Sequence, residues 1–331
     1  MIPAGGQVEL KTLERADRRR MSEALRRGEP VDLNLSRPPP PDVRLDEIAP
    51  LCRSVRSDNQ RLVDELSRGR APEAQPGSDI QVTAVIPTAD VVPIGLAALL
   101  GQDVAVRVLV LSNGEGGPRS IPGADVLRVP WRGHGATRQL AIPHITDPYT
   151  LLCVNDAIPL GAGFVRTLVE ALEAGNFDAV YARQIPWPDA DPITRRRLRK
   201  WTPAGQEAVN AEQVDHVAAL YRTETLRRFP LPDVPIAEDA VWSVGRRIGY
   251  VPAAPVLHSH PRSPRALFRR NRAIHTQLVR LGRPATVPSL GHVVGAMPSM
   301  IRPTIQGDRG ELFNQVAELL GQWRGGVKGR R

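Results

Sequence analysis

The sequence predicts an α/β protein built on a doubly wound, mainly parallel sheet. Three observations indicate this fold. Short apolar, β-branched runs alternate with helical segments, several runs are closed by Pro or Asn, and polar residues gather where the runs end. The composition agrees, because 41% hydrophobic and 24% charged residues are ordinary for a globular chain. Ligands of such sheets bind at the carboxyl ends of the strands.

The expected elements follow one another at short intervals. Strands are expected at residues 82–86, 104–111, 124–129, 149–154 and from 179 onward. Helices are expected at residues 94–101, 135–142, 164–174 and 241–248. Pro87 closes the first run, which suits a short buried strand. The segment 164–174 has the amphipathic spacing of a helix that covers the sheet.

Two flanking regions differ in composition from the sheet region, which is expected over residues 80–262. Residues 1–79 predict a helical, proline-rich extension, with helices at 7–27 and 45–69. Residues 263–331 predict a basic helical tail. Counted from residue 261, this end holds thirteen basic and three acidic side chains. A cationic tail binds polyanions such as a lipid headgroup surface, a nucleic acid or a phosphorylated substrate.

The composition also argues against several classes of protein. No run of eighteen apolar residues occurs, and the first residues lack a secretory signal pattern. The two cysteines, Cys52 and Cys153, form neither a disulfide framework nor a zinc cluster. We therefore expect a cytoplasmic protein, with peripheral attachment to the inner face of the membrane as an option. Nucleic-acid binding rests on charge alone, since aromatic residues make up 4% and no motif supports it.

Two polar segments are candidate metal ligands. Asn155 and Asp156 follow an apolar strand, where a carboxylate can hold a divalent cation or, alternatively, cap a turn. His258 and His260 follow another apolar run. In extended chain, residues at i and i+2 point to one face, so either imidazole could complete a metal site. An isolated histidine, in contrast, is usually structural.

Two further segments could contact a substrate. Glu238 and Asp239 precede an apolar stretch expected to be helical. The helix dipole explains one acid as a cap, and the other could act as a general base towards a hydroxyl. Arg138 ends the segment Gly-His-Gly-Ala-Thr-Arg, whose small residues allow a close approach of the backbone. The arginine suits a phosphate contact, or it could pair with an acid.

In their order along the chain, these motifs resemble family 2 glycosyltransferases with the GT-A fold, and within that family bacterial rhamnosyltransferase-like members. The matching segments are Val-Ile-Pro-Thr (85–88), Ser-Asn-Gly (112–114), Gly-x-Gly-Ala-x-Arg (133–138), Asn-Asp-Ala-Ile-Pro (155–159), Arg-Gln-Ile-Pro-Trp-Pro-Asp (183–189), Glu-Asp-x-x-Trp (238–242) and His-Ser-His (258–260). The resemblance covers roughly residues 80–272.

The resemblance implies a role for each matching residue. The residues implied to bind the nucleotide sugar are Pro87, Thr88, Ser112, Asn113, Arg138 and Asn155. Asp156 would stand for the last aspartate of the family's Asp-x-Asp motif and bind Mg²⁺ or Mn²⁺, with His258 or His260 near the metal. Asp239 would be the general base, and Glu238 its neighbour in the acceptor site.

The implied activity is a metal-dependent, inverting transfer of a hexosyl or deoxyhexosyl group. The donor would be a UDP-, dTDP- or GDP-sugar, and the acceptor a hydroxyl of a glycan, a lipid-linked glycan or a natural product. Two departures keep an alternative open. Relatives often carry an aspartate where Ser112 stands, and two carboxylates where only Asp156 is present. The alternative is a GT-A-like binding or scaffold protein that has lost catalysis and whose basic tail binds a membrane or another polyanion.

The basic tail keeps two interpretations open. Residues 264–282 place apolar side chains along one helical stripe among several arginines, which suits an anionic membrane surface or packing on the catalytic domain. Residues 285–306 are apolar but contain three prolines, so they are expected to lie in a membrane interface without spanning it.

Overall fold

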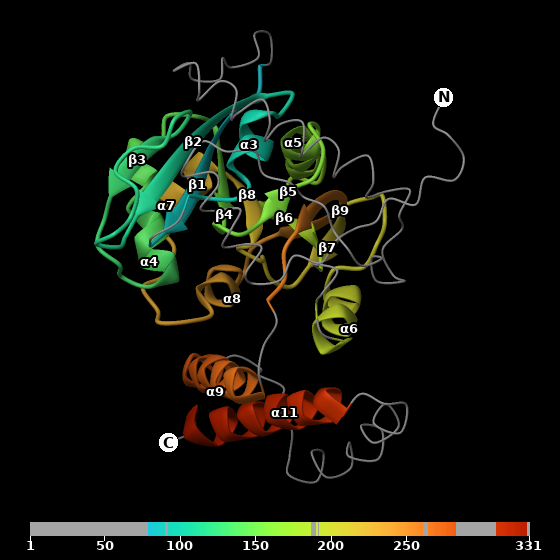
Figure 1. The fold of residues 1–331 in the computed structure, drawn as a ribbon. Coiled ribbons are helices and arrows are strands. Elements are labelled where there is room, and N and C mark those ends of the chain that lie inside the picture. The colour runs from blue at the N-terminus through green and yellow to red at the C-terminus, as the bar shows by residue number, and fades with distance from the viewer. Residues whose placement is uncertain are drawn as a thin grey trace, which may run out of the picture.

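The structure is a computed structural model that describes residues 79–89, 92–186, 190, 192–260, 264–282 and 309–329. The helices expected at 7–27 and 45–69 and the apolar segment 285–306 lie outside the described residues. The described chain forms a central sheet of nine strands with helices on both faces (Figure 1).

The sheet has a parallel half and a mixed half. The strands are β1 (Gln81–Thr88), β2 (Ala105–Ser112), β3 (Asp125–Arg128), β4 (Tyr149–Cys153), β5 (Ile158–Pro159), β6 (Ala179–Ile185), β7 (Val209–Ala211), β8 (Ala218–Arg222) and β9 (Ile248–Leu257). Their order is β3-β2-β1-β4-β8-β6-β9-β5, and β7 pairs with β9. The strands β1 to β4 are parallel, whereas β8 runs antiparallel to both β4 and β6. The α/β prediction is confirmed, with a sheet less uniformly parallel than expected.

The direction of the strands decides where a site can form. The strand β8 is antiparallel to both of its neighbours, so β4 and β6 run in the same direction. The strand β9 is parallel to β6 and therefore shares this direction. Six strands (β1, β2, β3, β4, β6 and β9) therefore point in one direction. Their carboxyl ends share one edge of the sheet, which is where open α/β sheets bind ligands.

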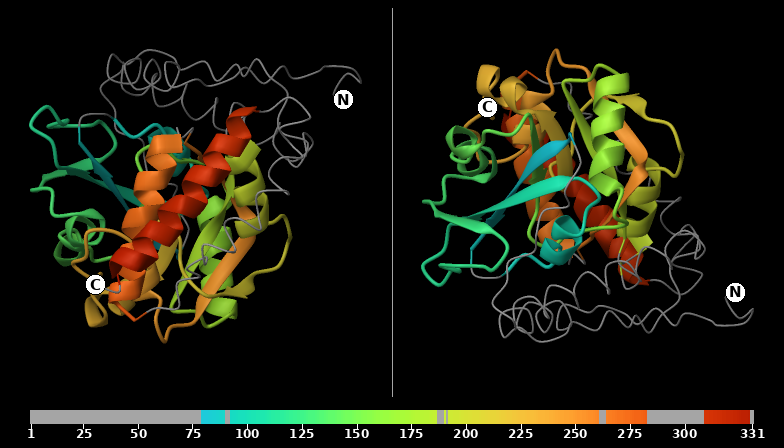
Figure 2. Two further views of the ribbon diagram at one scale, coloured as in Figure 1. Left: turned by 90° about the horizontal axis from the view of Figure 1, so that it is seen from below. Right: turned by 90° about the horizontal axis from the view of Figure 1, so that it is seen from above.

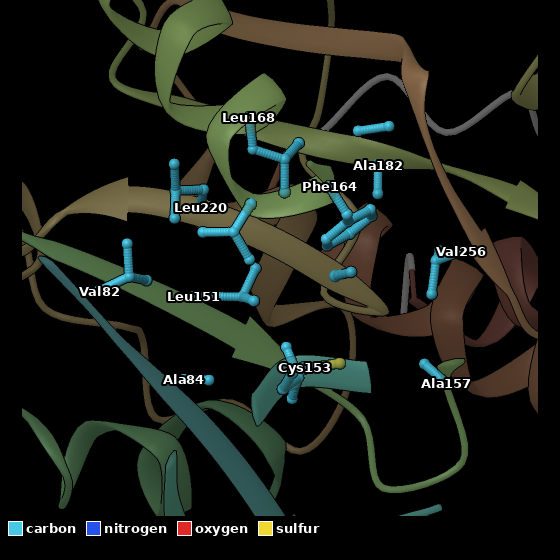
Figure 3. Packing of buried hydrophobic residues seen from close by; sticks show 14 of the residues in the cluster. Val82, Ala84, Leu151, Cys153, Ala157, Phe164, Leu168, Ala182, Leu220 and Val256 are labelled. Carbon is cyan, nitrogen blue, oxygen red and sulfur yellow. The ribbon is translucent and has the colours of Figure 1, made fainter. Parts of the chain in front are cut away.

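Alternate residues of the strands pack on opposite faces of the sheet. On one face, α3 (Leu96–Leu100) and α5 (Phe164–Ala174) cover side chains of β1, β4 and β8. Figure 3 shows Phe164 and Leu168 of α5 against Leu151 and Leu220. On the other face lie α7 (Thr223–Arg228), α8 (Glu238–Trp242) and the 3-10 turn Ile142–His144. Both faces of the sheet are thus covered, as expected for a doubly wound fold.

Two helices expected from the sequence are shorter than predicted. The helix α4 spans His134–Gln139 and continues as the 3-10 turn rather than reaching residue 142. The helix predicted over 241–248 is wrong: α8 ends at Trp242, and Ile248 already begins β9. Gly245 adopts φ +69°, a left-handed conformation that ends a helix and that glycine adopts without strain.

The described part of the tail forms a pair of helices. The helices α9 (Pro264–Arg280) and α11 (Arg309–Gly329) lie side by side, as the left view of Figure 2 shows, and α11 also contacts α6 (Pro192–Trp201). Gly321, Gly325 and Gly329 are spaced by four residues, and a Cβ at each would meet atoms of α9. These glycines allow the two helices to approach closely.

The contact between α9 and α11 can be compared with the two interpretations of the basic tail, membrane binding and packing. Leu267, the first residue of the predicted apolar stripe, is 3% exposed, whereas Leu281 at the other end is 42% exposed. The main partner of α9 among the described residues is α11, which is itself part of the tail, so the expected packing on the catalytic domain stays a prediction. Of the helices in the described ranges, none has the length and apolar character needed to cross a membrane.

Candidate active site

The predicted nucleotide-binding residues at the ends of β1, β2 and β4 lie together. The side-chain amide of Asn155 donates a hydrogen bond to Thr88 Oγ1 at 3.2 Å, and the backbone N–H of Asn113 donates to Thr88 O at 2.9 Å. Pro87 precedes Thr88 in β1, and Ser112 is the last residue of β2. Five of the six residues assigned to the nucleotide sugar thus occupy neighbouring strand ends. Arg138 is placed elsewhere.

A glycine-containing loop approaches these strand ends closely. A Cβ at Gly114 or Gly117 would meet the backbone oxygen of Ala89, so neither position has room for a side chain. Ser112 is 1% exposed, and among the described residues its Oγ has no hydrogen-bond partner. A buried hydroxyl without a partner costs free energy, so a ligand atom that bonds to it would be stabilised there.

The three predicted metal ligands come together at the same edge. Asp156 follows β4, and His258 and His260 follow β9. His258 Nε2 lies 3.5 Å from Asp156 Oδ1, and His260 Nε2 lies 3.3 Å from Asp156 Oδ2. The two Nε2 atoms are 3.2 Å apart. One donor atom from each residue thus lies within 4.8 Å of the other two.

This donor set suits a divalent cation. Atoms that bind one ion at about 2.1 Å are about 3.0–3.4 Å from one another in octahedral or tetrahedral geometry. The separations of 3.2–3.5 Å are close to these values. One carboxylate and two imidazoles form a mixed oxygen and nitrogen donor set that could hold such an ion.

One residue without an assigned role contacts this cluster, and a second is hydrogen-bonded to the first. Gln184 Oε1, at the end of β6, lies 3.0 Å from His258 Nδ1. The amide nitrogen of Gln184 donates to Asp215 Oδ2 at 2.6 Å. Gln184 is within the segment that resembles the family, but nothing in its local pattern indicated a contact to His258. The contact joins residues 74 positions apart, which only the folded sheet brings together.

The two neighbouring acids, Glu238 and Asp239, lie in different surroundings. Glu238 is 6% exposed, and its Oε1 lies 3.3 Å from Arg138 Nη1 and 3.2 Å from His216 Nδ1. Burial raises the pKa of Glu238, but the hydrogen bond to His216 and the charges of His216 and Arg138 outweigh it and lower the pKa to about 2. Glu238 is therefore an ionised anchor for Arg138 and His216.

Asp239 has the opposite shift. Its Oδ1 accepts a hydrogen bond from Ala240 N at 2.7 Å. Burial raises the pKa of Asp239 to about 6, and the charges of Glu238 and Asp215 add to the rise against the opposing charge of His216. A carboxylate with this pKa accepts a proton more readily than an ordinary aspartate while still being ionised at neutral pH. Adjacent acids whose pKa values are driven apart are typical of active sites.

The position of Arg138 explains the small residues that precede it. A Cβ at Gly135 would lie 2.7 Å from Pro232 O and 3.1 Å from Glu238 Cβ, so glycine allows α4 to approach α8. Arg138, on the next turn, is 3% exposed and reaches Glu238. The sequence left open a phosphate contact or an acidic partner, and the structure places Arg138 beside a buried acid.

Asp215 is linked to the candidate metal ligands through Gln184, and its charge acts on the acid pair. Asp215 binds Gln184, which contacts His258, and its charge contributes to the raised pKa of Asp239. His216, the next residue, contacts Glu238 and also lies 2.7 Å from Tyr221 Oη. Both residues precede β8, and sequence reasoning missed them. The pair Asp-His before an apolar strand was the available signal.

The comparisons with known proteins agree with the fold. The chain matches no family model and no curated protein. Its structure is similar to the mannosyltransferase PcManGT from Pyrobaculum calidifontis in complex with GDP-Man and Mn²⁺, with a TM-score of 0.54 and 14% identity, over 86% of this chain and 97% of that one. TarS 1-349 from S. aureus in complex with UDP gives a TM-score of 0.41 at 14% identity, over 75% and 92% of the two chains. The likeness to PcManGT confirms the GT-A-type fold.

Proposed function

We propose that this protein is a metal-dependent glycosyltransferase that moves a sugar from a nucleotide-sugar donor to a hydroxyl group. The proposal rests on the cluster of Asp156, His258 and His260 at the carboxyl edge of the sheet. The fold supports it, because PcManGT, which has a similar fold, was solved with GDP-Man and Mn²⁺. The donor of this chain is a nucleoside diphosphate sugar, held by the residues at the ends of β1, β2 and β4.

The reaction we infer is a single displacement with inversion at the anomeric carbon. Asp239 accepts the proton of the acceptor hydroxyl as its oxygen attacks the sugar. Glu238 holds Arg138 and His216 in place beside Asp239. A bound divalent cation would neutralise the negative charge on the departing diphosphate. From the donor set, we infer that Mn²⁺ serves better than Mg²⁺.

We infer that the acceptor is anionic or attached to an anionic surface. The helix α9 contains five arginines and no acidic residue. Burial lowers the pKa of His134 in α4, and the charges of Arg138 and of Arg270 on α9 lower it further against the charge of Glu238. Phosphate groups of a lipid-linked acceptor or of the membrane itself would complement these arginines.

Donor binding by the full chain tests the proposal. A panel of UDP, dTDP and GDP sugars, each with Mn²⁺, is expected to include one donor that raises the melting temperature and is slowly hydrolysed. Asp156→Asn is expected to abolish both effects. Asp125→Asn, an equivalent change at an exposed ion pair with Arg107, is the matched control and keeps them.

The competing function is a scaffold that has lost catalysis, which the reduced metal motif favours. It predicts that no donor is hydrolysed and that Asp156→Asn and Asp239→Asn behave as the unchanged protein does. Binding of a donor without any turnover, with an acceptor extract present, would support the scaffold over the enzyme.

A further inference from the structure

We propose that Asp215 and Gln184 are positioning residues that fix the tautomer of His258, so that its Nε2 lone pair faces the metal site. The inference rests on the proposed function, because it concerns how this chain prepares a ligand for the metal. It adds two residues that neither touch the metal nor carry a role in the resemblance described above.

The three side chains form a continuous hydrogen-bonded relay. Asp215 Oδ1 accepts from the backbone N–H of Val217 at 3.0 Å, and Asp215 Oδ2 accepts from Gln184 Nε2 at 2.6 Å. Gln184 Oε1 then lies 3.0 Å from His258 Nδ1. On the opposite side of the ring, His258 Nε2 faces Asp156 and His260.

The chemistry of the relay allows one arrangement of protons. A carboxylate only accepts hydrogen bonds, so the amide of Gln184 must turn its NH₂ group towards Asp215. The amide oxygen therefore faces His258 and can only accept. His258 Nδ1 must then carry the proton, and a neutral imidazole with a proton on Nδ1 has a free lone pair on Nε2. That lone pair is what a metal ligand requires.

The backbone holds the relay in register. Gln184 and His258 are each 7% exposed. They lie at the ends of the paired strands β6 and β9, where His258 N donates to Ile185 O at 2.9 Å. The hydroxyl of Thr202 donates to Gln184 O at 3.1 Å. With both backbones fixed, Asp215 sets the orientation of the Gln184 amide, and that amide presents its oxygen to His258 Nδ1.

The variant Asp215→Asn is expected to exchange donors and acceptors along these hydrogen bonds while keeping the size of the side chain at position 215. The N–H of Val217 keeps the new amide oxygen in place, so the amide NH₂ group is directed towards Gln184. Gln184 must then turn its oxygen to position 215 and its NH₂ group to His258. His258 Nδ1 becomes an acceptor, and the proton moves to Nε2, where it blocks the metal.

A second variant is expected to restore the acceptor that faces His258 Nδ1. In Asp215→Asn combined with Gln184→Glu, the new carboxylate accepts from the amide at 215 through one oxygen and from His258 Nδ1–H through the other. The single change is therefore expected to fail and the double change to recover. A purely structural role for Asp215 predicts that the double variant is worse than the single one.

The first measurement needs no metal and no substrate. Long-range ¹H–¹⁵N correlation spectra of the full metal-free chain at about pH 8 distinguish Nδ1–H from Nε2–H imidazoles. The signal of His258 is assigned by its loss in His258→Gln. We expect Nδ1–H in the unchanged protein and in the double variant, and Nε2–H in Asp215→Asn.

The second measurement is Mn²⁺ affinity, determined by titration of the same proteins. We expect Asp215→Asn to weaken Mn²⁺ binding about 10–100-fold, which is typical when a partner of a metal-bound histidine is lost. Asp178→Asn is the matched control: Asp178 also accepts a backbone hydrogen bond, from Arg247 N at 2.8 Å, but lies before the opposite end of β6. Its affinity is expected to be unchanged.

The outcomes separate this inference from the proposed function. If Asp215→Asn leaves the tautomer of His258 or the affinity for Mn²⁺ unchanged, the inference is wrong, whatever the protein does with sugars. If the unchanged protein has the Nδ1–H tautomer but binds no Mn²⁺, the metal site of the proposed function fails and the relay does not serve it.

Discussion

Two neighbouring carboxylates with opposite surroundings define the chemistry at the residue scale. Glu238 has two basic partners at 3.2–3.3 Å, and its pKa is lowered to about 2. Asp239 lies among other acids, and burial raises its pKa to about 6. Of the two, Asp239 is the group whose proton affinity suits a general base at neutral pH.

The pH dependence of the reaction follows from this assignment. A general base must be deprotonated, so we expect kcat/KM to be flat above about pH 7 and to fall about tenfold per unit well below pH 6. Initial rates at several pH values with saturating Mn²⁺ measure the profile. A fall centred near pH 4, the range of an ordinary carboxyl, would contradict the role of Asp239.

The raised pKa of Asp239 also makes the stability of the folded protein depend on pH. The folded-state pKa of Asp239 is raised, so protonation favours the folded state: the contribution is complete below the unfolded value near 4 and is lost as the pH rises through about 6. At about pH 7.5, Asp239→Asn is expected to abolish transfer while raising the melting temperature by roughly 3–6 °C. Thermal melts measure this, and the gain should disappear below about pH 4.

The sequence allowed part of the site to be predicted, because local patterns singled out the polar residues and the family resemblance implied that they share a metal. Asp156, His258 and His260 were identified as possible ligands of one metal, and their donor atoms do lie together. Gln184, Asp215 and His216 were missed, because their contacts join β6, the segment before β8, α8 and β9. Such contacts depend on the strand order, which no local pattern specifies.

At the scale of elements, the helix α5 was predicted correctly from the sequence, whereas the helix expected at residues 241–248 was not. The amphipathic period predicted α5 with the bounds that the structure has, Phe164–Ala174. The apolar run after Asp239 gave a wrong prediction, because its residues are divided between α8 and β9. Ser243 contributes to this break: its hydroxyl donates to Asp239 O and accepts from Val214 N. The run is also interrupted by Ser243, Gly245 and two arginines, which were signals of a break between the two elements.

The contact between α4 and α8 is sensitive to a single methyl group. We expect Gly135→Ala to destabilise the protein by about 1–3 kcal/mol, because the Cβ would lie 2.7 Å from the backbone oxygen of Pro232, which cannot move aside cheaply. Urea unfolding measures the change. Gly116→Ala, where a Cβ meets nothing within 4 Å, is the matched control and should cost well under about 1 kcal/mol. Equal effects of the two changes would contradict the close packing.

At the scale of the whole molecule, charge is concentrated at one end of the chain. The side chains of Arg265, Arg269 and Arg272 on α9 are exposed. Changing all three to Gln is expected to reduce binding to phosphatidylserine vesicles roughly 100-fold, at about 1 kcal/mol per arginine. Co-sedimentation at low and high salt measures the loss. Arg107, Arg119 and Arg228, exposed on other elements, are the matched triple change and should have little effect. A similar loss in both variants would show attraction by net charge rather than by α9.

The place of β8 in the sheet constrains how the chain reaches its native state. This strand joins the two halves, yet it is translated after both of the strands that flank it. Until residues 218–222 leave the ribosome, β4 and β6 present unpaired backbone edges on nascent polypeptide. We therefore expect rapid pairing of β8 with both strands to limit aggregation of the nascent chain.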